Sequence, residues 1–283
     1  MKKTIQLLLV ALFFAAFNLK SQPGVFQPGE YRDGIYTKEN SNDRRYIPYT
    51  HLREADVAWE KRVWRELDLR DKQNQVLFYP IDFSASGNGR LSLIRMLAKY
   101  IIQGQIIAFK DEDFLAPLEL SEVKSKLVKC DSLKESTFTE AGDEVMTSRW
   151  NCDSTTILRE ITVWRIKEDW FFDKQKSVLE VRILGLQALS RDPDKGLKDL
   201  FWVYFPACRP YFAKNEVFNP KNDSERRTFE DIFWKRQFIS TVFKETNVYD
   251  RQFLDYSHGI DQLLESDRVK NDIFRWEHDL WHF

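Results

Sequence analysis

The chain has 283 residues and a formal net charge of −1, with 43% hydrophobic and 31% charged residues. This composition is typical of a globular protein, and the near-neutral charge gives no reason to expect nucleic acid or an anionic membrane surface as a partner. The 22 Phe, 10 Tyr and 9 Trp residues make the chain rich in aromatic side chains. Such a chain is expected to have an aromatic core, aromatic contact surfaces, or both.

The first 21 residues have the pattern of a secretory signal peptide. Two lysines precede an apolar run over residues 7–17, and Ser21 supplies a small residue for cleavage, with earlier cleavage after an alanine as the alternative. The apolar run is too short for a permanent transmembrane helix. The first cysteine is Cys130, so no lipid-attachment site is expected near the junction. Removing the leader, which has three lysines and no acid, lowers the formal charge from −1 to −4.

An extended arm is expected over residues 22–50, where prolines and glycines are frequent and no periodic apolar pattern occurs. Its aromatic residues indicate that the arm lies against another surface, and Tyr31 and Tyr36 are candidate interface residues. The rest of the chain, residues 51–283, is predicted to form a single α+β domain, with two closely packed lobes as the alternative.

The stretch AWEKRVWRELDLR predicts a helix over residues 58–70. On a helix, Trp59 shares its column with two aliphatic residues at spacings of four, whereas Trp64 lies roughly 140° around the axis. One interpretation is a helix wedged between two parts of its own domain. The other is a helix with Trp59 in the core and Trp64, together with Arg62 and Arg65, facing another protein, because interfaces favour Trp and Arg.

The remaining elements indicate an α+β fold whose β-rich middle is an antiparallel meander with short turns at DKQKS and DPDKG. The expected strands cover residues 76–82, 105–109, 157–166, 168–172, 178–186 and 199–205. Helices are expected over residues 91–103, near 119–129 within a polar region at 111–156, and over 224–240 and 260–281.

Three cysteines in an exported chain leave at least one unpaired. Cys130 and Cys152 stand in similar settings, KCDS and NCDS, on either side of a polar segment, which makes them the disulfide candidates in an oxidising compartment. Cys208, between two prolines in FPACRPYF, is expected to be a buried free thiol. The odd count also leaves open a disulfide to a partner.

No catalytic or cofactor signature is present, so we expect a protein that is not an enzyme and needs no cofactor. His278 and His282 stand four residues apart, a spacing that some metal sites on helices use, but the sequence is not HExxH and structural histidines are expected. The loop SGNGR matches no nucleotide-binding glycine motif and is expected to be a strand-to-helix turn. Trp281, near the end of the last predicted helix, is a further interface candidate.

Five long strings in this order resemble the GldN/PorN family over nearly all of the mature chain: WEKRVWRELDLRDKQNQ, VLFYPIDFSASGNGRLSLIRML, TVWRIKEDWFFD, FWVYFPACRPYF and DIFRWEHDLWHF. The resemblance implies a non-catalytic part of the type IX secretion system, which also serves gliding motility. It implies a periplasmic protein that forms a ring with copies of itself and with a GldK/PorK-type outer-membrane lipoprotein, and that meets the periplasmic part of a GldM/PorM-type motor protein. The alternatives are a periplasmic peptide- or ligand-binding protein and, third, a metal-dependent hydrolase.

Overall fold

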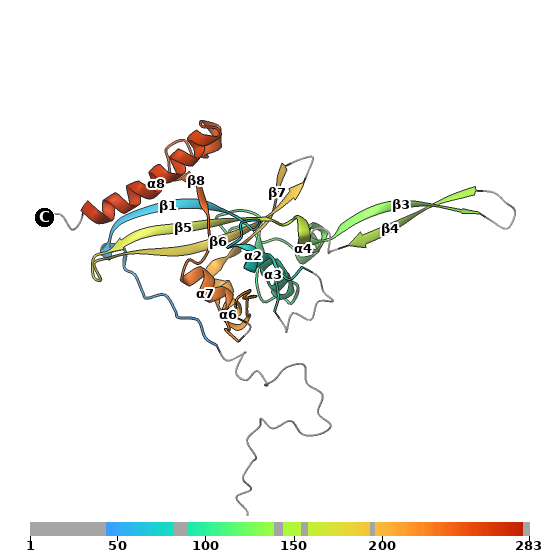
Figure 1. The fold of residues 1–283 in the computed structure, drawn as a ribbon, viewed down its shortest axis with the longest axis horizontal. Coiled ribbons are helices and arrows are strands. Elements are labelled where there is room, and N and C mark those ends of the chain that lie inside the picture. Colours follow the sequence, from blue (N-terminus) through green and yellow to red (C-terminus); the bar gives the residue numbers. More distant parts are fainter. Residues whose placement is uncertain are drawn as a thin grey trace, which may run out of the picture. The chain divides into compact units, whose positions relative to one another are not determined.

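The structure is a computed structural model that describes residues 44–81, 90–138, 144–153, 158–192, 196–222 and 224–279, with the backbone alone over residues 129–153 (Figure 1). Residues 42–283 group into one compact unit. The predicted leader, the first part of the arm with Tyr31 and Tyr36, and Trp281 lie outside the described residues.

A six-stranded sheet forms the centre of the fold, and every described pair of neighbouring strands in it is antiparallel, in the order β2-β7-β6-β5-β1-β8. Three consecutive strands, β5, β6 and β7, form the predicted meander. With the helices below, the sheet confirms the α+β class. The strands are β1 (Val57–Asp68), β2 (Ala108–Phe109), β5 (Val163–Asp173), β6 (Val178–Asp192), β7 (Gly196–Tyr204) and β8 (Thr241–Glu245).

The predicted helix over residues 58–70 is wrong, because Val57–Asp68 is strand β1. It pairs with β5 on one side and β8 on the other. The spacing of four that suggested a helical column is an even number, so it also places residues on one face of a strand. Charged residues of this segment pair across strands, as Arg62 does with Asp169 at 2.6 Å.

One face of the sheet carries two separate apolar clusters. The larger cluster joins Trp164 and Phe201 of the sheet to buried residues such as Met96, Phe212 and Phe229 of the helices. Figure 1 shows α6 and α7 near β6, and α8 alongside β1 and β8. The helices are α2 (Gln75–Phe78), α3 (Leu93–Ile102), α4 (Leu120–Leu127), α6 (Phe205–Lys214), α7 (Phe229–Trp234) and α8 (Ile260–Asp279), with 3-10 turns η1 (Glu54–Asp56) and η2 (Phe253–Asp255).

The smaller cluster fixes α8 to the sheet. Its buried members come from β1, β8, η2 and α8, and Trp59 of β1 stacks on Trp276 of α8 with ring centroids 4.5 Å apart. The buried residues of this cluster are Val63, Val242, Phe253, Val269 and Ile273.

The helices at 91–103, near 119–129 and at 260–281 are confirmed as α3, α4 and α8. The strand expected over 76–82 is wrong, since Gln75–Phe78 is the short helix α2. The helix expected over 224–240 is only the six residues of α7, which begins at a capping box between Thr228 and Asp231 and is followed by strand β8. The two strands expected at 157–166 and 168–172 are the single strand β5.

FPACRPYF, for which the sequence predicted no helix, lies in helix α6. Pro206 stands in the first turn, where a missing N–H costs no intrahelical hydrogen bond. Cys208 is fully buried in this helix and is free, which confirms the expected buried thiol. Burial raises its pKa far above the usual range, so the thiol stays protonated and unreactive.

The polar region at 111–156 contains a hairpin that the sequence did not predict, formed by β3 (Lys129–Phe138) and β4 (Glu144–Asp153) as a separate two-stranded sheet. Its register places Cys130 directly opposite Cys152. Directly opposed residues of antiparallel strands have Cα atoms roughly 4.5–5.5 Å apart, within the range of disulfides. The disulfide stays a prediction, now supported by the backbone register.

Candidate functional site

Residues 44–50, which we call the strap, are held against the domain by one buried arginine. Arg209 of α6 is 1% exposed, and its guanidinium donates to both the Ile47 carbonyl, at 2.6 Å, and the Glu230 carboxylate, at 2.5 Å. A buried guanidinium needs both a counter-charge and hydrogen-bond acceptors. Glu230 supplies the charge, and the strap supplies a further acceptor for Arg209. Three aromatic rings lie with their centroids within 5.0 Å of this guanidinium: Tyr46, Tyr49 and Trp234.

Both ends of the strap have additional anchors. Arg44 donates to Asp231 at 3.2 Å, and Tyr49 stacks on Trp234 with centroids 5.7 Å apart. Burial raises the pKa of Glu230, although the Arg209 guanidinium opposes the shift. These contacts fix the strap as part of the folded surface.

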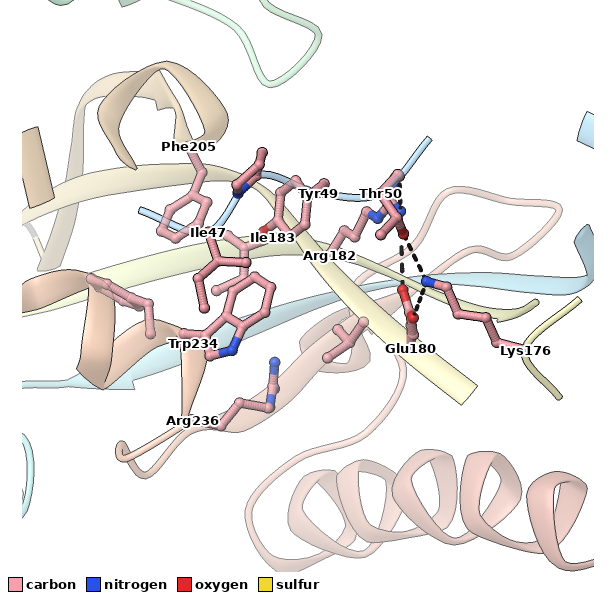
Figure 2. Close-up of a pocket in the computed structure, with 13 residues that line it drawn as sticks. Ile47, Tyr49, Thr50, Lys176, Glu180, Arg182, Ile183, Phe205, Trp234 and Arg236 are labelled. Atoms are coloured by element: carbon pink, nitrogen blue, oxygen red, sulfur yellow. Dashed lines mark hydrogen bonds and ion pairs between the residues drawn. The ribbon is translucent and has the colours of Figure 1, made fainter. Parts of the chain in front are cut away.

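A pocket of about 330 Å³ lies between the strap, β6, the start of α6 and the end of α7 (Figure 2). Its mouth is polar: Lys176 Nζ donates to Thr50 Oγ1 at 2.7 Å and to Glu180 at 2.6 Å, and Arg182 donates to the Thr50 carbonyl at 2.8 Å. The strap therefore forms one wall of the pocket and is tied to the opposite wall. The apolar lining consists of Ile47, Pro48, Val181, Ile183, Phe205 and Phe233.

A buried ion-pair network borders this pocket. Glu168 of β5 is fully buried and accepts hydrogen bonds from Arg65, from Arg236 at 2.8 Å and from the Trp170 indole at 3.0 Å. Burial alone would raise the pKa of Glu168, but the guanidinium groups of Arg236 and Arg65 outweigh it and hold the pKa below its usual range. Arg236 also lines the pocket, so the network fixes part of the pocket wall.

The opposite face of the sheet carries an aromatic and cationic cluster around Trp64. The indole Nε1 donates to Glu112 at 2.7 Å, and the ammonium groups of Lys244 and Lys167 lie 4.5 and 5.9 Å from its ring centroid. Phe114, in a left-handed backbone conformation with φ 58°, lies over the same cluster. The loop around Phe114 thus covers this face with the chain's own side chains.

The pocket has the features of a binding site. Among the described residues, no group of three or more His, Cys, Asp or Glu side chains is suited to a metal ion. The Cys208 thiol is buried and protonated, and Glu168 is fully committed to its arginines. An apolar pocket with cationic groups at its mouth has the features of a site for a hydrophobic side chain or a small ligand.

Of the two tryptophans, only Trp64 was expected to face another protein, and that expectation is wrong; Trp59, expected in the core, packs against the smaller cluster. Trp64 is 6% exposed and belongs to the domain's own cluster, while Trp59 is half-buried on the other face of β1. Arg65 is buried against Glu168, and Arg62 is partly exposed in its pair with Asp169. Of these candidates only Arg62 keeps substantial surface, so a contact with another protein through it stays a prediction.

Sequence reasoning missed Arg209 and the pocket. The available signal was a cation between apolar residues: in FPACRPYF, Arg209 sits beside buried Cys208 and three residues before buried Phe212. An arginine at such a position requires a buried carboxylate elsewhere. That carboxylate, Glu230, is 21 residues away, and no local pattern identifies it.

The structure describes only one of the two histidines that stand four residues apart. His278 is exposed on α8, with its ring 6.4 Å from Phe274, and His282 lies outside the described residues. Over the described part of the chain, no helix combines the length and apolarity that crossing a membrane requires.

Together these features define an α+β protein with a strapped surface pocket and extensive buried ion pairs, in which the described side chains assemble no recognisable catalytic group. The family model described as "Gliding motility associated protein GldN" matches residues 52–282. The chain therefore belongs to the GldN family and is a gliding-motility-associated protein. No match was found among curated proteins.

Proposed function

We propose that this chain is a non-catalytic structural subunit of the type IX secretion system, which exports proteins and serves gliding motility. The observation that carries the proposal is the family match over residues 52–282, which spans every described helix and strand. The chain works in the periplasm, where its predicted leader directs it, and associates with the outer membrane through a partner.

The partners follow from the family resemblance. A GldK/PorK-type lipoprotein anchors the chain to the outer membrane, copies of the chain assemble laterally into a ring, and the periplasmic part of a GldM/PorM-type protein contacts that ring. A subunit with several partners needs several distinct contact surfaces. The strap, the pocket beside it and the exposed apolar residues of α8 supply different surfaces for this purpose.

Affinity purification of the full chain from solubilised outer membranes tests this function. We expect the lipoprotein to co-purify in an assembly many times larger than one subunit, and chemical cross-links to join copies of the chain. A tagged chain that elutes as a monomer without the lipoprotein would contradict the proposal. A matched purification from an unsolubilised periplasmic extract controls for chain that has not assembled.

A periplasmic peptide- or ligand-binding protein is the second candidate, and the pocket beside the strap favours it. Its volume of about 330 Å³ lies at the lower end of the range of small-molecule sites, roughly 300–1,000 Å³. This function predicts a monomer that carries a bound ligand after gentle purification. Native mass spectrometry of the same sample distinguishes the two candidates.

A further inference from the structure

The outward face of α8 carries apolar side chains that nothing in the described part of the chain covers. Ile260, Leu263 and Leu264 are between 56% and 76% exposed, while the inward face buries Val269 and Ile273 against the sheet. All three exposed residues lie in the first two turns. The helix is also acidic, with six Asp or Glu residues and three Lys or Arg residues between Ile260 and Asp279.

A groove of complementary character lies between α3 and α4. Its volume is about 330 Å³ and its floor is apolar, formed by residues such as Ala98, Leu127 and Leu158. The charged side chains that line it are all cationic: Arg95, Lys99 and Lys124. Across both helices there are four Lys or Arg residues and one acid.

The two surfaces lie toward opposite sides of the six-stranded sheet, since β7 is next to the edge strand β2 and β8 is the other edge. The helix α8 packs on β8, one edge strand, whereas α4 is tied to β7 by the hydrogen bond from Lys126 Nζ to the Leu200 carbonyl at 2.7 Å. Four strand spacings separate β7 from β8, which is roughly 19 Å at about 4.8 Å per spacing. A chain cannot place its own α8 in its own groove without undocking the helix from the sheet.

We infer that the first three turns of α8 dock in the α3–α4 groove of a second copy of this chain. The ten residues of α3 give the groove a length of about 15 Å, which matches about three helical turns. Leu263 and Leu264 face the apolar floor, and the exposed carboxylates of Asp261 and Asp267 face the cationic rim. This is recognition of an amphipathic helix by a groove.

The contact joins two different patches of one molecule, so it is heterologous and repeats from copy to copy. Such contacts build a ring when the rotation per copy closes, and a filament when it does not. The inference rests on the proposed function, in which copies of the chain assemble laterally, and it identifies one lateral contact of that assembly.

Paired charge reversal tests the contact in the full mature chain. Lys99→Glu with Lys124→Glu reverses the groove, and Asp261→Lys with Asp267→Lys reverses the helix. We expect each reversal alone to weaken self-association about tenfold or more, and the chain carrying both to recover most of it, because like-charge contacts become complementary again. Sedimentation velocity and cross-linking yield measure self-association. The control is Lys72→Glu with Lys221→Glu, two exposed lysines that neither line the groove nor lie on α8, which should change nothing.

A second variant tests the apolar part. Leu264→Asp should abolish self-association while the thermal melt of the monomer stays unchanged, because this side chain is exposed within one copy. Self-association that survives Leu264→Asp, or a doubly reversed chain that stays as weak as either single reversal, would overturn the inference.

Binding of the outer-membrane lipoprotein separates the two levels of the argument. A wild-type chain that binds the lipoprotein and self-associates through other residues refutes this contact alone. A wild-type chain that binds no lipoprotein and stays monomeric refutes the proposed function and, with it, the contact.

Discussion

Replacing Glu168 by Gln is expected to destabilise the fold more than any exposed charge substitution. Glu168 is fully buried, and it accepts hydrogen bonds from Arg65, Arg236 and Trp170. Gln keeps the size of the side chain but removes the negative charge. Arg65, of which only 11% of the side chain is exposed, is then left with a buried positive charge and no carboxylate.

Breaking a buried ion pair by removing one partner costs about 3–5 kcal/mol. For a chain of this size, each kcal/mol lowers the melting temperature by about 2–4 °C, so the Glu168→Gln variant should melt roughly 10 °C below the wild type. The matched control is Glu180→Gln, which removes a partly exposed pair with Lys176 and should cost at most about 1 kcal/mol.

The pH dependence gives an independent measurement of the same network. The folded pKa of Glu168 is lowered from its ordinary value of 4.5, so its contribution to stability is fully present above that value and is lost as the pH falls through the folded pKa. Between pH 7 and pH 3, the wild type should therefore lose more stability than Glu168→Gln. Denaturant unfolding at a series of pH values measures this difference. A Glu168→Gln variant within about 1 kcal/mol of the wild type at pH 7 would refute the reasoning.

Three further substitutions test other parts of the fold. Trp64→Ala should cost about 3–5 kcal/mol, as large-to-small changes of buried residues do, and Trp59→Ala should cost less because Trp59 is only half-buried; equal losses in thermal melts would contradict this order. Gly185→Ala should cost about 1–3 kcal/mol, because a Cβ atom there would lie 2.5 Å from Phe114 Cζ, whereas Ser177→Ala, which only shortens an exposed side chain, should be nearly neutral; unchanged stability at Gly185 would show that the Phe114 ring moves aside at no cost. Cys130 and Cys152, which are register partners in β3 and β4, should form a disulfide that peptide maps made without reductant detect. Free thiols at both positions would contradict the prediction.

How well the sequence predicts an element depends on whether the spacing of its apolar residues fits a helix alone or fits both a helix and a strand. In α8, apolar residues recur at spacings of three and four, and only a helix places both spacings on one face. Its boundaries were therefore predicted within two residues. In β1, the pattern used spacings of four, which a helix and a strand share, and the charged residues between them removed the usual alternation. Arg62, Arg65 and Glu66 find their partners on β5, more than 95 residues away, so local sequence carries no trace of the pairing.

The candidate site was less predictable than the fold because it is assembled from distant segments. The strap, β6, the start of α6 and the end of α7 each contribute a few residues to the pocket, and none of these segments has a motif of its own. Of the aromatic residues that predicted contact between the arm and another surface, Tyr46 and Tyr49 are described, and both lie against the domain. These rings contact the guanidinium of Arg209, which also donates a hydrogen bond to the Ile47 carbonyl.

The position of the Glu168 network explains why α8 is attached to the domain by so small a cluster. Val63, Arg65 and Leu67 alternate along one face of β1, so Arg65 stands between Val63 of the smaller cluster and Leu67 of the larger one. Glu168, the register partner of Val63 on β5, likewise stands between Ile166 of the larger cluster and Trp170, which packs against the smaller one. The ion pair thus divides one continuous sheet face into a large core and a small one, and only the small one holds α8. Because the network satisfies its charges internally, the two apolar clusters need not merge across it, and α8 keeps its other face, with its exposed leucines, available for a neighbour.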